Sequence, residues 1–314
     1  MRYSLTVSVV LVAGIIGWCV LSLRADLAKM SLAPLWHSWD AVAIAMTLTM
    51  ANYALRVVRW QWYLRLLGHI VTLNFSALTY IAGFAFTLVP GKVGELVRAR
   101  YYVDRGIPVR DVAAAFCVER LMDLMSLLVL ATLIVSAFSH YDGLIVTAAG
   151  AGIVCLALLA VLPWDAIAHF FACTPRIPRV LARASANVMR ALAGARILLR
   201  PRTVLFGFLI ALMAWGLEGL GLRVLGSIFA PSRVDAPVAI GIYGVAVLVG
   251  TVSFLPGGLG STEAVMTTLL AARGYSVAAA LLITLACRLV TLWLGVCLGW
   301  MAVVLLRFRL GEER

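Results

Sequence analysis

Hydrophobic residues in this chain occur in long runs, separated by short polar segments that are rich in arginine. A run of about 20 apolar residues predicts a helix that crosses a lipid bilayer. The sequence therefore predicts an all-α polytopic membrane protein with about six full spans, forming a single integral membrane domain over residues 1–314. The predicted spans cover residues 5–23, 40–58, 120–139, 143–163, 203–226 and 277–306.

Two further apolar segments, residues 73–90 and 237–256, each end at a Pro-Gly pair. The chain reads LVPGKVGELVRARY from Leu88 and FLPGGLGSTEAV from Phe254. Proline ends a helical hydrogen-bond ladder and glycine permits a sharp turn, so a helix break is predicted at each place. Each segment is predicted to enter the bilayer and return to the same side as a re-entrant hairpin. The predicted break residues are Pro90, Gly91, Pro256, Gly257 and Gly258.

The arginines set the predicted orientation, because basic loops of membrane proteins stay in the cytoplasm. Residues 173–202 carry seven arginines and are predicted to form a basic cytoplasmic loop. Both termini are then cytoplasmic, in the inner membrane. On this count the segment 73–90 begins and ends inside, whereas residues 237–275 begin and end outside.

The composition supports a lipid environment, since 63% of residues are hydrophobic and only 13% are charged. The net charge of +12 lies in loops, where it suits anionic lipid headgroups, and we expect membrane lipids rather than nucleic acid as partners. The six cysteines and four histidines are scattered, so no metal or other cofactor is predicted. No GxSxG, HExxH or P-loop motif is present, and no catalytic residue is predicted.

The two halves of the chain match at a nearly constant offset. Glu95 and Glu263 are 168 residues apart, and so are Arg120 and Arg288. The motif LRVV, which starts at Leu55, recurs as LRVL 167 residues later. Because the first unit starts outside and the second inside, the pattern predicts an inverted repeat, which is typical of secondary transporters with a midplane site. The predicted repeat units cover about residues 52–139 and 218–306.

Arginines in apolar sequence are the main candidates for binding. A guanidinium binds phosphate through a planar fork and keeps its charge, so Arg120 and Arg288 are predicted to hold an anionic headgroup, most simply a lipid phosphate. The helices that restart near Gly94 and Gly260 are predicted to present free N–H groups to the same anion.

The two matched glutamates leave alternatives open. Glu95 and Glu263 can pair with Arg120 and Arg288 when the site is empty, or they can carry a coupling proton. Equally, the pairs Glu95–Arg120 and Glu263–Arg288 can be structural ion pairs that fix each hairpin.

Other charged and aromatic residues are secondary candidates. Asp123 lies one helical turn beyond Arg120 and is predicted to neutralise it. Glu119 is predicted to point elsewhere and to mark the membrane edge, and Glu218 is predicted to pair with Arg223. The aromatic residues around Arg59, which are Trp60, Trp62 and Tyr63, are predicted to form an interfacial anchor.

Three motifs, PGKVGELVRARYY, ERLMDL and FLPGGLGSTE, together resemble the lysylphosphatidylglycerol synthase transmembrane-region family, also called flippase-like domain proteins. The resemblance extends from about residue 10 to residue 306. The family includes the membrane half of the multiple peptide resistance factor, which moves aminoacylated phosphatidylglycerol between leaflets. It also includes stand-alone members, some linked to hopanoid synthesis or to polyprenyl-phosphate sugar pathways. The signature positions are Pro90, Gly91, Gly94, Glu95, Arg98, Glu119, Arg120, Asp123, Pro256, Gly257, Gly258, Gly260 and Glu263.

The resemblance implies a lipid flippase or transporter that works by alternating access. Its substrate would be an anionic or phosphate-bearing lipid, such as an aminoacyl-phospholipid, a polyprenyl-phosphate or a related lipid. The alternatives are a membrane subunit that presents a lipid to a separate lipid-synthesis enzyme, including a hopanoid-associated one, and a non-transporting envelope scaffold. The sequence has no counterpart of the soluble aminoacyl-transferase domain of the synthase members, so we expect no lysyl transfer and no enzyme activity.

Overall fold

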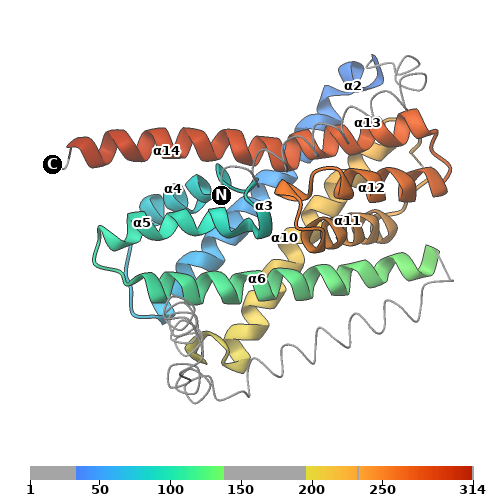
Figure 1. Cartoon of the computed structure of the whole chain (residues 1–314). Coiled ribbons are helices and arrows are strands. Elements are labelled where there is room, and N and C mark those ends of the chain that lie inside the picture. The colour runs from blue at the N-terminus through green and yellow to red at the C-terminus, as the bar shows by residue number, and fades with distance from the viewer. Residues whose placement is uncertain (1–32, 138–195, 232, 313–314) are drawn as a thin grey trace, which may run out of the picture.

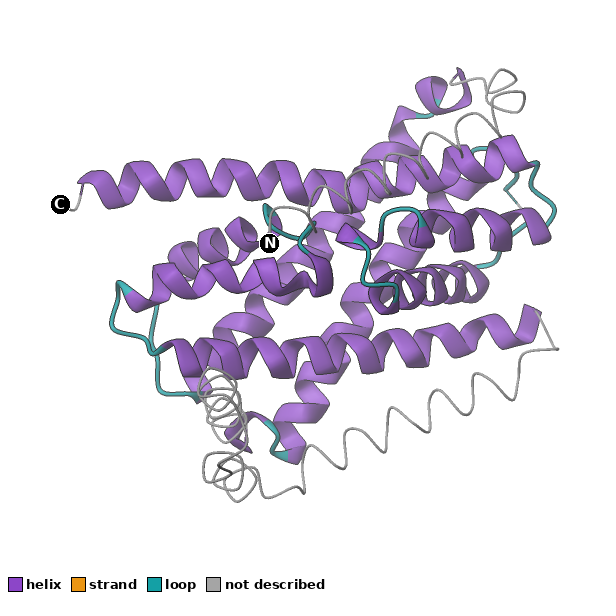
Figure 2. Ribbon diagram, in the orientation of Figure 1, coloured by secondary structure: helices purple, strands orange, loops and turns teal. Residues whose placement is uncertain are grey.

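The computed structural model describes residues 33–137, 196–231 and 233–312, and in these ranges every regular element is a helix (Figures 1 and 2). The predicted spans 5–23 and 143–163, and most of the basic loop 173–202, lie outside the described residues.

Three of the described helices are long and apolar enough to cross a membrane. They are α3 (Trp39–Leu66), α10 (Pro201–Ser227) and the continuous helix Val277–Phe308. The last contains α13 (Val277–Arg288), a single π turn η5 (Leu289–Trp293) and the first part of α14 (Leu294–Glu312). Together with the shorter apolar helices α4 (Leu73–Phe84) and α11 (Ala236–Val252), they make this a multi-pass membrane protein.

The remaining elements include the two predicted breaks. They are α2 (Ala33–His37), α4 (Leu73–Phe84), the 3₁₀ helix η1 (Pro90–Val97), α5 (Arg98–Val103), α6 (Val109–Ala131), the 3₁₀ helix η2 (Thr132–Ala137), α11 (Ala236–Val252), the 3₁₀ turn η4 (Pro256–Gly258) and α12 (Ser261–Ala272). The helix that carries the predicted span 120–139 begins before that span, because α6 starts directly after Pro108. Proline is compatible with a helix start but not with a helix interior, so Arg120 lies in the middle of α6.

The centre of the fold is an antiparallel pair of long helices, α3 and α10. The Asn52 amide donates to the carbonyl of Ala214 at 2.7 Å in the buried middle of the pair. Towards one end, the rings of Trp62 and Phe206 contact each other with centroids 4.3 Å apart. The later residue of α3, Trp62, thus faces the earlier residue of α10, Phe206, so the two helices run in opposite directions.

Two short hairpins lie at opposite ends of the molecule in Figure 1. Helices α4 and α5 lie towards the C-terminal end of α14, whereas α11 and α12 lie towards the start of α13 (Figure 1). Glycines permit both to pack closely on a neighbouring helix. A side chain on Gly299 of α14 would overlap the backbone nitrogen of Ala85, and one on Gly244 of α11 would lie 3.1 Å from that of Ala131.

The order of elements is the same in both halves. A long helix is followed by a short one, a Pro-Gly break, another short helix and a closing helix. The closing helices begin at Val109 and Val277, which are separated by the same 168 residues as Glu95 and Glu263.

Candidate functional site

The two breaks meet in the middle of the described structure (Figure 1). A side chain on Gly257 would lie 2.8 Å from Leu88 Cδ2, so the second break touches the segment that leads into the first. The second break requires glycine, because Gly257, Gly258 and Gly260 have φ angles of 60°, 67° and 87°. Such angles are costly for residues with a side chain.

The structure places the two predicted helix restarts differently. Gly94 lies inside the 3₁₀ helix η1, so its backbone belongs to a helical ladder rather than to a helix start. Glycine is needed there for space, since a side chain would overlap the carbonyl oxygen of Phe86. Gly260 precedes α12, but its N–H donates to Glu263 Oε2 at 2.6 Å. Glu263 therefore caps the start of its own helix at the Gly260 amide.

A cavity of about 210 Å³ lies between the two breaks. Its charged lining comes from both halves of the chain, with three arginines and three carboxylates. They are Arg56, Glu95, Arg120, Asp123, Glu218 and Arg288. The rest of the lining includes the aromatic rings of Tyr53, Phe84, Trp215 and Tyr243. The predicted arginines of the two halves of the chain, Arg120 and Arg288, thus line one cavity.

Both matched glutamate–arginine pairs are present, but they differ in geometry. Arg120 Nη2 lies 3.6 Å from Glu95 Oε2, and that oxygen has no hydrogen-bond partner. Arg288 Nε instead donates to Glu263 Oε1 at 2.5 Å, and its Nη2 donates to the carbonyl of Gly257 at 2.7 Å. The second pair is thus joined by one hydrogen bond and fixed to its break by two more, from Gly260 and to Gly257, whereas the first pair is loose.

The π turn η5 directly follows Arg288 in the closing helix. The helix from Val277 changes to a π turn directly after this residue, and π turns inside α-helices often occur at functional sites. The carbonyl of Thr291, within the π turn, accepts a hydrogen bond of 2.5 Å from the hydroxyl of Tyr53 on α3. The closing helix is therefore anchored to the central helix pair beside the cavity.

The prediction that Glu119 points away from Arg120 was wrong. Its side chain is fully buried and lies 2.6 Å from Arg98, 3.3 Å from Arg59 and 3.3 Å from Arg120. Tyr80 also donates a hydrogen bond to it. The buried arginines on α3 and α5 draw Glu119 inward, because a buried charge requires a partner of opposite sign.

Asp123 pairs with Arg120 as the spacing predicted, at 3.0 Å. It has a second partner that the sequence did not indicate, since Arg59 donates to its Oδ1 at 2.7 Å. Asp123 therefore links the cavity to the buried cluster of Glu119 and its arginines.

The aromatic residues near Arg59 do not form a simple interfacial anchor. Trp60 and Tyr63 are fully buried, and the Arg98 guanidinium lies 3.7 Å from the centroid of the Trp60 ring. This cation–π contact with Trp60 and the ion pair with Glu119 together hold Arg98 in place. The predicted role of these aromatic residues came from their position beside Arg59 in the sequence. Their contact with Arg98 of α5 appears only when the helices are packed.

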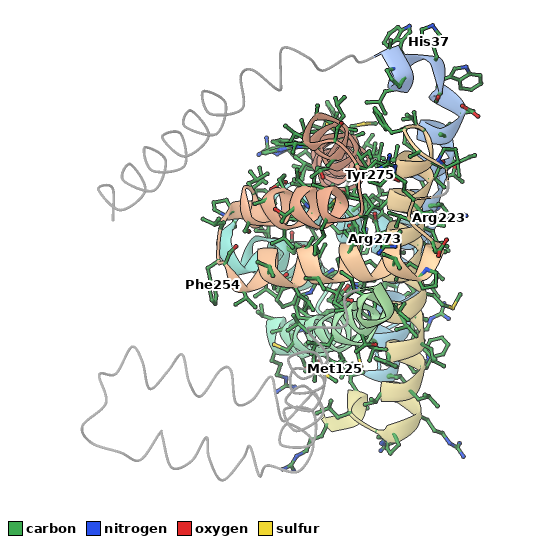
Figure 3. All side chains as sticks on the ribbon, turned by 90° about the vertical axis from the view of Figure 1, so that its right-hand side faces the viewer. His37, Met125, Arg223, Phe254, Arg273 and Tyr275 are labelled. Carbon is green, nitrogen blue, oxygen red and sulfur yellow. The ribbon has the colours of Figure 1, made fainter. Side chains whose placement is uncertain are left out.

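Glu218 and Arg223 do not share a site as the spacing suggested. Glu218 is buried, lines the cavity and accepts a hydrogen bond of 3.3 Å from Thr49. Arg223 is exposed and lies at the margin of the molecule in Figure 3. Five residues correspond to about 140° around a helix with 3.6 residues per turn, so the two side chains leave α10 in different directions.

Two arginines of the site were not predicted, Arg56 and Arg59 of α3. Arg56 lines the cavity and Arg59 is fully buried against Glu119 and Asp123. The sequence did hold a signal, because Arg56 belongs to the LRVV motif that recurs around Arg223. In the ranges that the structure describes, no group of three or more His, Cys, Asp or Glu residues is placed to hold a metal ion.

The fold and this cavity define a class, a helical multi-pass membrane protein with a charged internal site between two broken helices. The family model described as Lysylphosphatidylglycerol synthase TM region matches residues 5–299, and the chain belongs to this family. The resemblance of the three motifs is thereby confirmed. A comparison with curated proteins finds no match.

Proposed function

We propose that this protein translocates an anionic or phosphate-bearing lipid across the inner membrane by alternating access. The observation that carries the proposal is that Arg120 and Arg288, one from each half, line the same cavity where the two breaks meet. Two guanidinium groups facing one space suit a phosphate, which they can bind by paired hydrogen bonds. Membership of a family of membrane-region domains supports a membrane substrate.

The size of the cavity suits a headgroup rather than a whole lipid. Pockets for drug-sized ligands measure about 300–1,000 Å³. The cavity of about 210 Å³ has room for a phosphate-bearing headgroup, while the acyl chains stay in the bilayer.

The proposal includes an inverted repeat with two gates and cytoplasmic termini. It is supported by the common order of elements in both halves and by the positions of the two hairpins at opposite ends of the molecule (Figure 1). The hairpin α4–α5 would close the cavity from the cytoplasm and α11–α12 from the outside. Movement of one half against the other would then expose the same site to each face in turn.

Transport in vesicles tests the proposal. Proteoliposomes of phosphatidylcholine with a trace of fluorescent phosphatidylglycerol would be treated with a membrane-impermeant quencher, and the rate at which the inner label appears outside would be measured. We expect Arg120→Gln and Arg288→Gln to slow this rate by about tenfold or more, as lost charge-assisted hydrogen bonds imply. The matched control is Arg223→Gln, which removes an exposed arginine outside the cavity and should keep the wild-type rate.

Each other outcome has a defined meaning. Wild-type rates in both cavity variants would remove the two arginines from the site. If the wild-type chain converts headgroups in detergent and moves no lipid, it is an enzyme subunit of lipid synthesis. If it does neither, while retaining partner proteins, it is an envelope scaffold.

A further inference from the structure

We propose that Arg56 is the principal contact for the substrate phosphate and that it binds the phosphate together with Arg120. This inference rests on the proposed function. It names a residue outside the matched pair Arg120 and Arg288, which the sequence had indicated for phosphate binding. It makes the binding site asymmetric, formed mainly by the first half of the chain, although the cavity is lined by both.

The first step is the state of the three cavity arginines. Arg288 has two of its three nitrogens in use, since its Nε and Nη2 donate to Glu263 and to the carbonyl of Gly257. Arg56 is only 5% exposed, yet its Nε and Nη2 make no hydrogen bond. Arg120 also has an Nε and an Nη2 without a hydrogen-bond partner. Arg56 and Arg120 therefore each have two buried nitrogens available to a ligand.

The second step is how Arg56 is held. Its guanidinium carbon lies 5.4 Å from the ring centroids of Phe84 and Trp215 and 5.8 Å from that of Tyr80. These aromatic faces fix the position of the guanidinium without using its N–H groups. A dehydrated cation with unused donors is costly, and an incoming anion would remove that cost.

The third step is the group now placed between the two arginines. Asp123 Oδ2 lies 3.0 Å from Arg120 Nη2 and 3.5 Å from Arg56 Nη2, and it has no hydrogen-bond partner. The other oxygen of this carboxylate is held by Arg59 at 2.7 Å. A phosphate oxygen between Arg56 and Arg120 would replace Asp123 Oδ2, while Arg59 keeps the carboxylate neutralised.

The fourth step is the comparison with the matched position in the second half. Arg56 and Arg223 share the local sequence Leu-Arg-Val, but Arg56 lies ten residues before the end of α3, which is Leu66, and Arg223 lies four residues before the end of α10, which is Ser227. Arg56 is buried in the cavity wall, whereas Arg223 is exposed. Arg223 is therefore a natural control for Arg56, because it has the same local sequence but lies outside the cavity.

Binding to the purified full chain in detergent tests the inference separately from transport. The probes are dioctanoyl phosphatidylglycerol, dioctanoylglycerol without phosphate, and inorganic phosphate, each titrated by a change in thermophoresis. We expect Arg56→Gln to bind the phosphatidylglycerol about tenfold more weakly or worse, as loss of charge-assisted hydrogen bonds predicts. Arg223→Gln should bind it with an affinity within about twofold of wild type, because a rim charge outside the site contributes little.

A conservative variant keeps the test valid if Arg56→Gln fails to fold. Arg56→Lys retains the charge beside Asp123 but loses the planar fork, so we expect a wild-type unfolding temperature and an intermediate loss of binding. Wild-type affinity in a folded Arg56→Gln or Arg56→Lys protein would overturn the inference, whatever the transport assay shows.

The remaining outcomes distinguish the proposed phosphate site from the proposed lipid translocation. Loss of phosphatidylglycerol binding in Arg56→Gln, with no lipid movement by the wild type in vesicles, would support the site and reject the translocase. If only inorganic phosphate binds, and Arg56→Gln abolishes this, the anion site stands and its ligand is free phosphate rather than a lipid. Equal binding of dioctanoylglycerol and phosphatidylglycerol would show that the phosphate is not recognised and would overturn the inference.

Discussion

Glu119 shows how one buried carboxylate organises several cations in an apolar protein. It is fully buried on α6 and contacts arginines of both α3 and α5, at 2.6 Å for Arg98 and 3.3 Å for Arg59. Buried charges are stable only when paired, so these residues depend on one another. The cluster of Glu119 with its arginines therefore fixes α3, α5 and α6 behind the cavity.

Replacement of Glu119 by glutamine should destabilise the protein strongly. Loss of the negative charge leaves Arg98 buried without its carboxylate partner and takes one of two carboxylates from Arg59, and breaking a buried pair costs about 3–5 kcal/mol. The measurement is the thermal unfolding midpoint in detergent. The control Asp104→Asn changes an exposed carboxylate and should alter stability by no more than about 0.5 kcal/mol. Equal midpoints for the two variants would contradict the role of Glu119 in the cluster.

At the scale of helices, close contact through glycine determines how each hairpin is attached. The end of α4 packs on α14 at Gly299, and α11 packs on η2 at Gly241 and on the end of α6 at Gly244. In lipid, helices associate through close packing rather than through water exclusion, and small residues permit it. Each hairpin is thus attached to the closing helix of the other half of the chain.

A methyl group at this contact should loosen the first hairpin. In Gly299→Ala the new Cβ would overlap the backbone nitrogen of Ala85, and overpacking of this kind costs about 1–3 kcal/mol. Gly216 of α10 is the matched control, because a Cβ there has no neighbour within 4 Å. Gly216→Ala should leave the unfolding midpoint unchanged or raise it, since alanine favours a helix by about 0.5–1 kcal/mol. A midpoint for Gly299→Ala at or above that of Gly216→Ala would refute the contact.

At the scale of the whole molecule, the two hairpins lie at opposite ends and their breaks meet at the centre (Figure 1). This arrangement gives one cavity two boundaries, one from each hairpin. Under the proposed topology, the α5–α6 connection faces the cytoplasm and the α12–α13 connection faces the outside.

Cysteine labelling of intact cells tests that topology. In a background in which the six native cysteines are replaced, Asp104→Cys places a thiol on the α5–α6 connection, and Ala272→Cys places one on the last residue of α12, where the α12–α13 connection begins. Both positions are exposed. We expect an impermeant maleimide to label the second in intact cells and the first only after permeabilisation. Arg200→Cys and Asp235→Cys serve as inside and outside references. The same labelling pattern for residues 104 and 272 would exclude the inverted arrangement.

The sequence by itself determined the class and family of this protein, and it located the breaks. Apolar length depends on consecutive residues, so the spans at 40–58 and 203–226 agree with α3 and α10. The pairs Glu95–Arg120 and Glu263–Arg288 were also visible, because their spacing repeats along the chain.

Only the tertiary structure decided which charges share the cavity and which are merely near one another in the chain. Arg56 and Arg223 have the same local sequence, but one is buried between Phe84 and Trp215 and the other is exposed. Glu119 has its partners on α3 and α5, 60 and 21 residues away. Burial and pairing depend on the packing of distant helices, and no local pattern of residues encodes that packing.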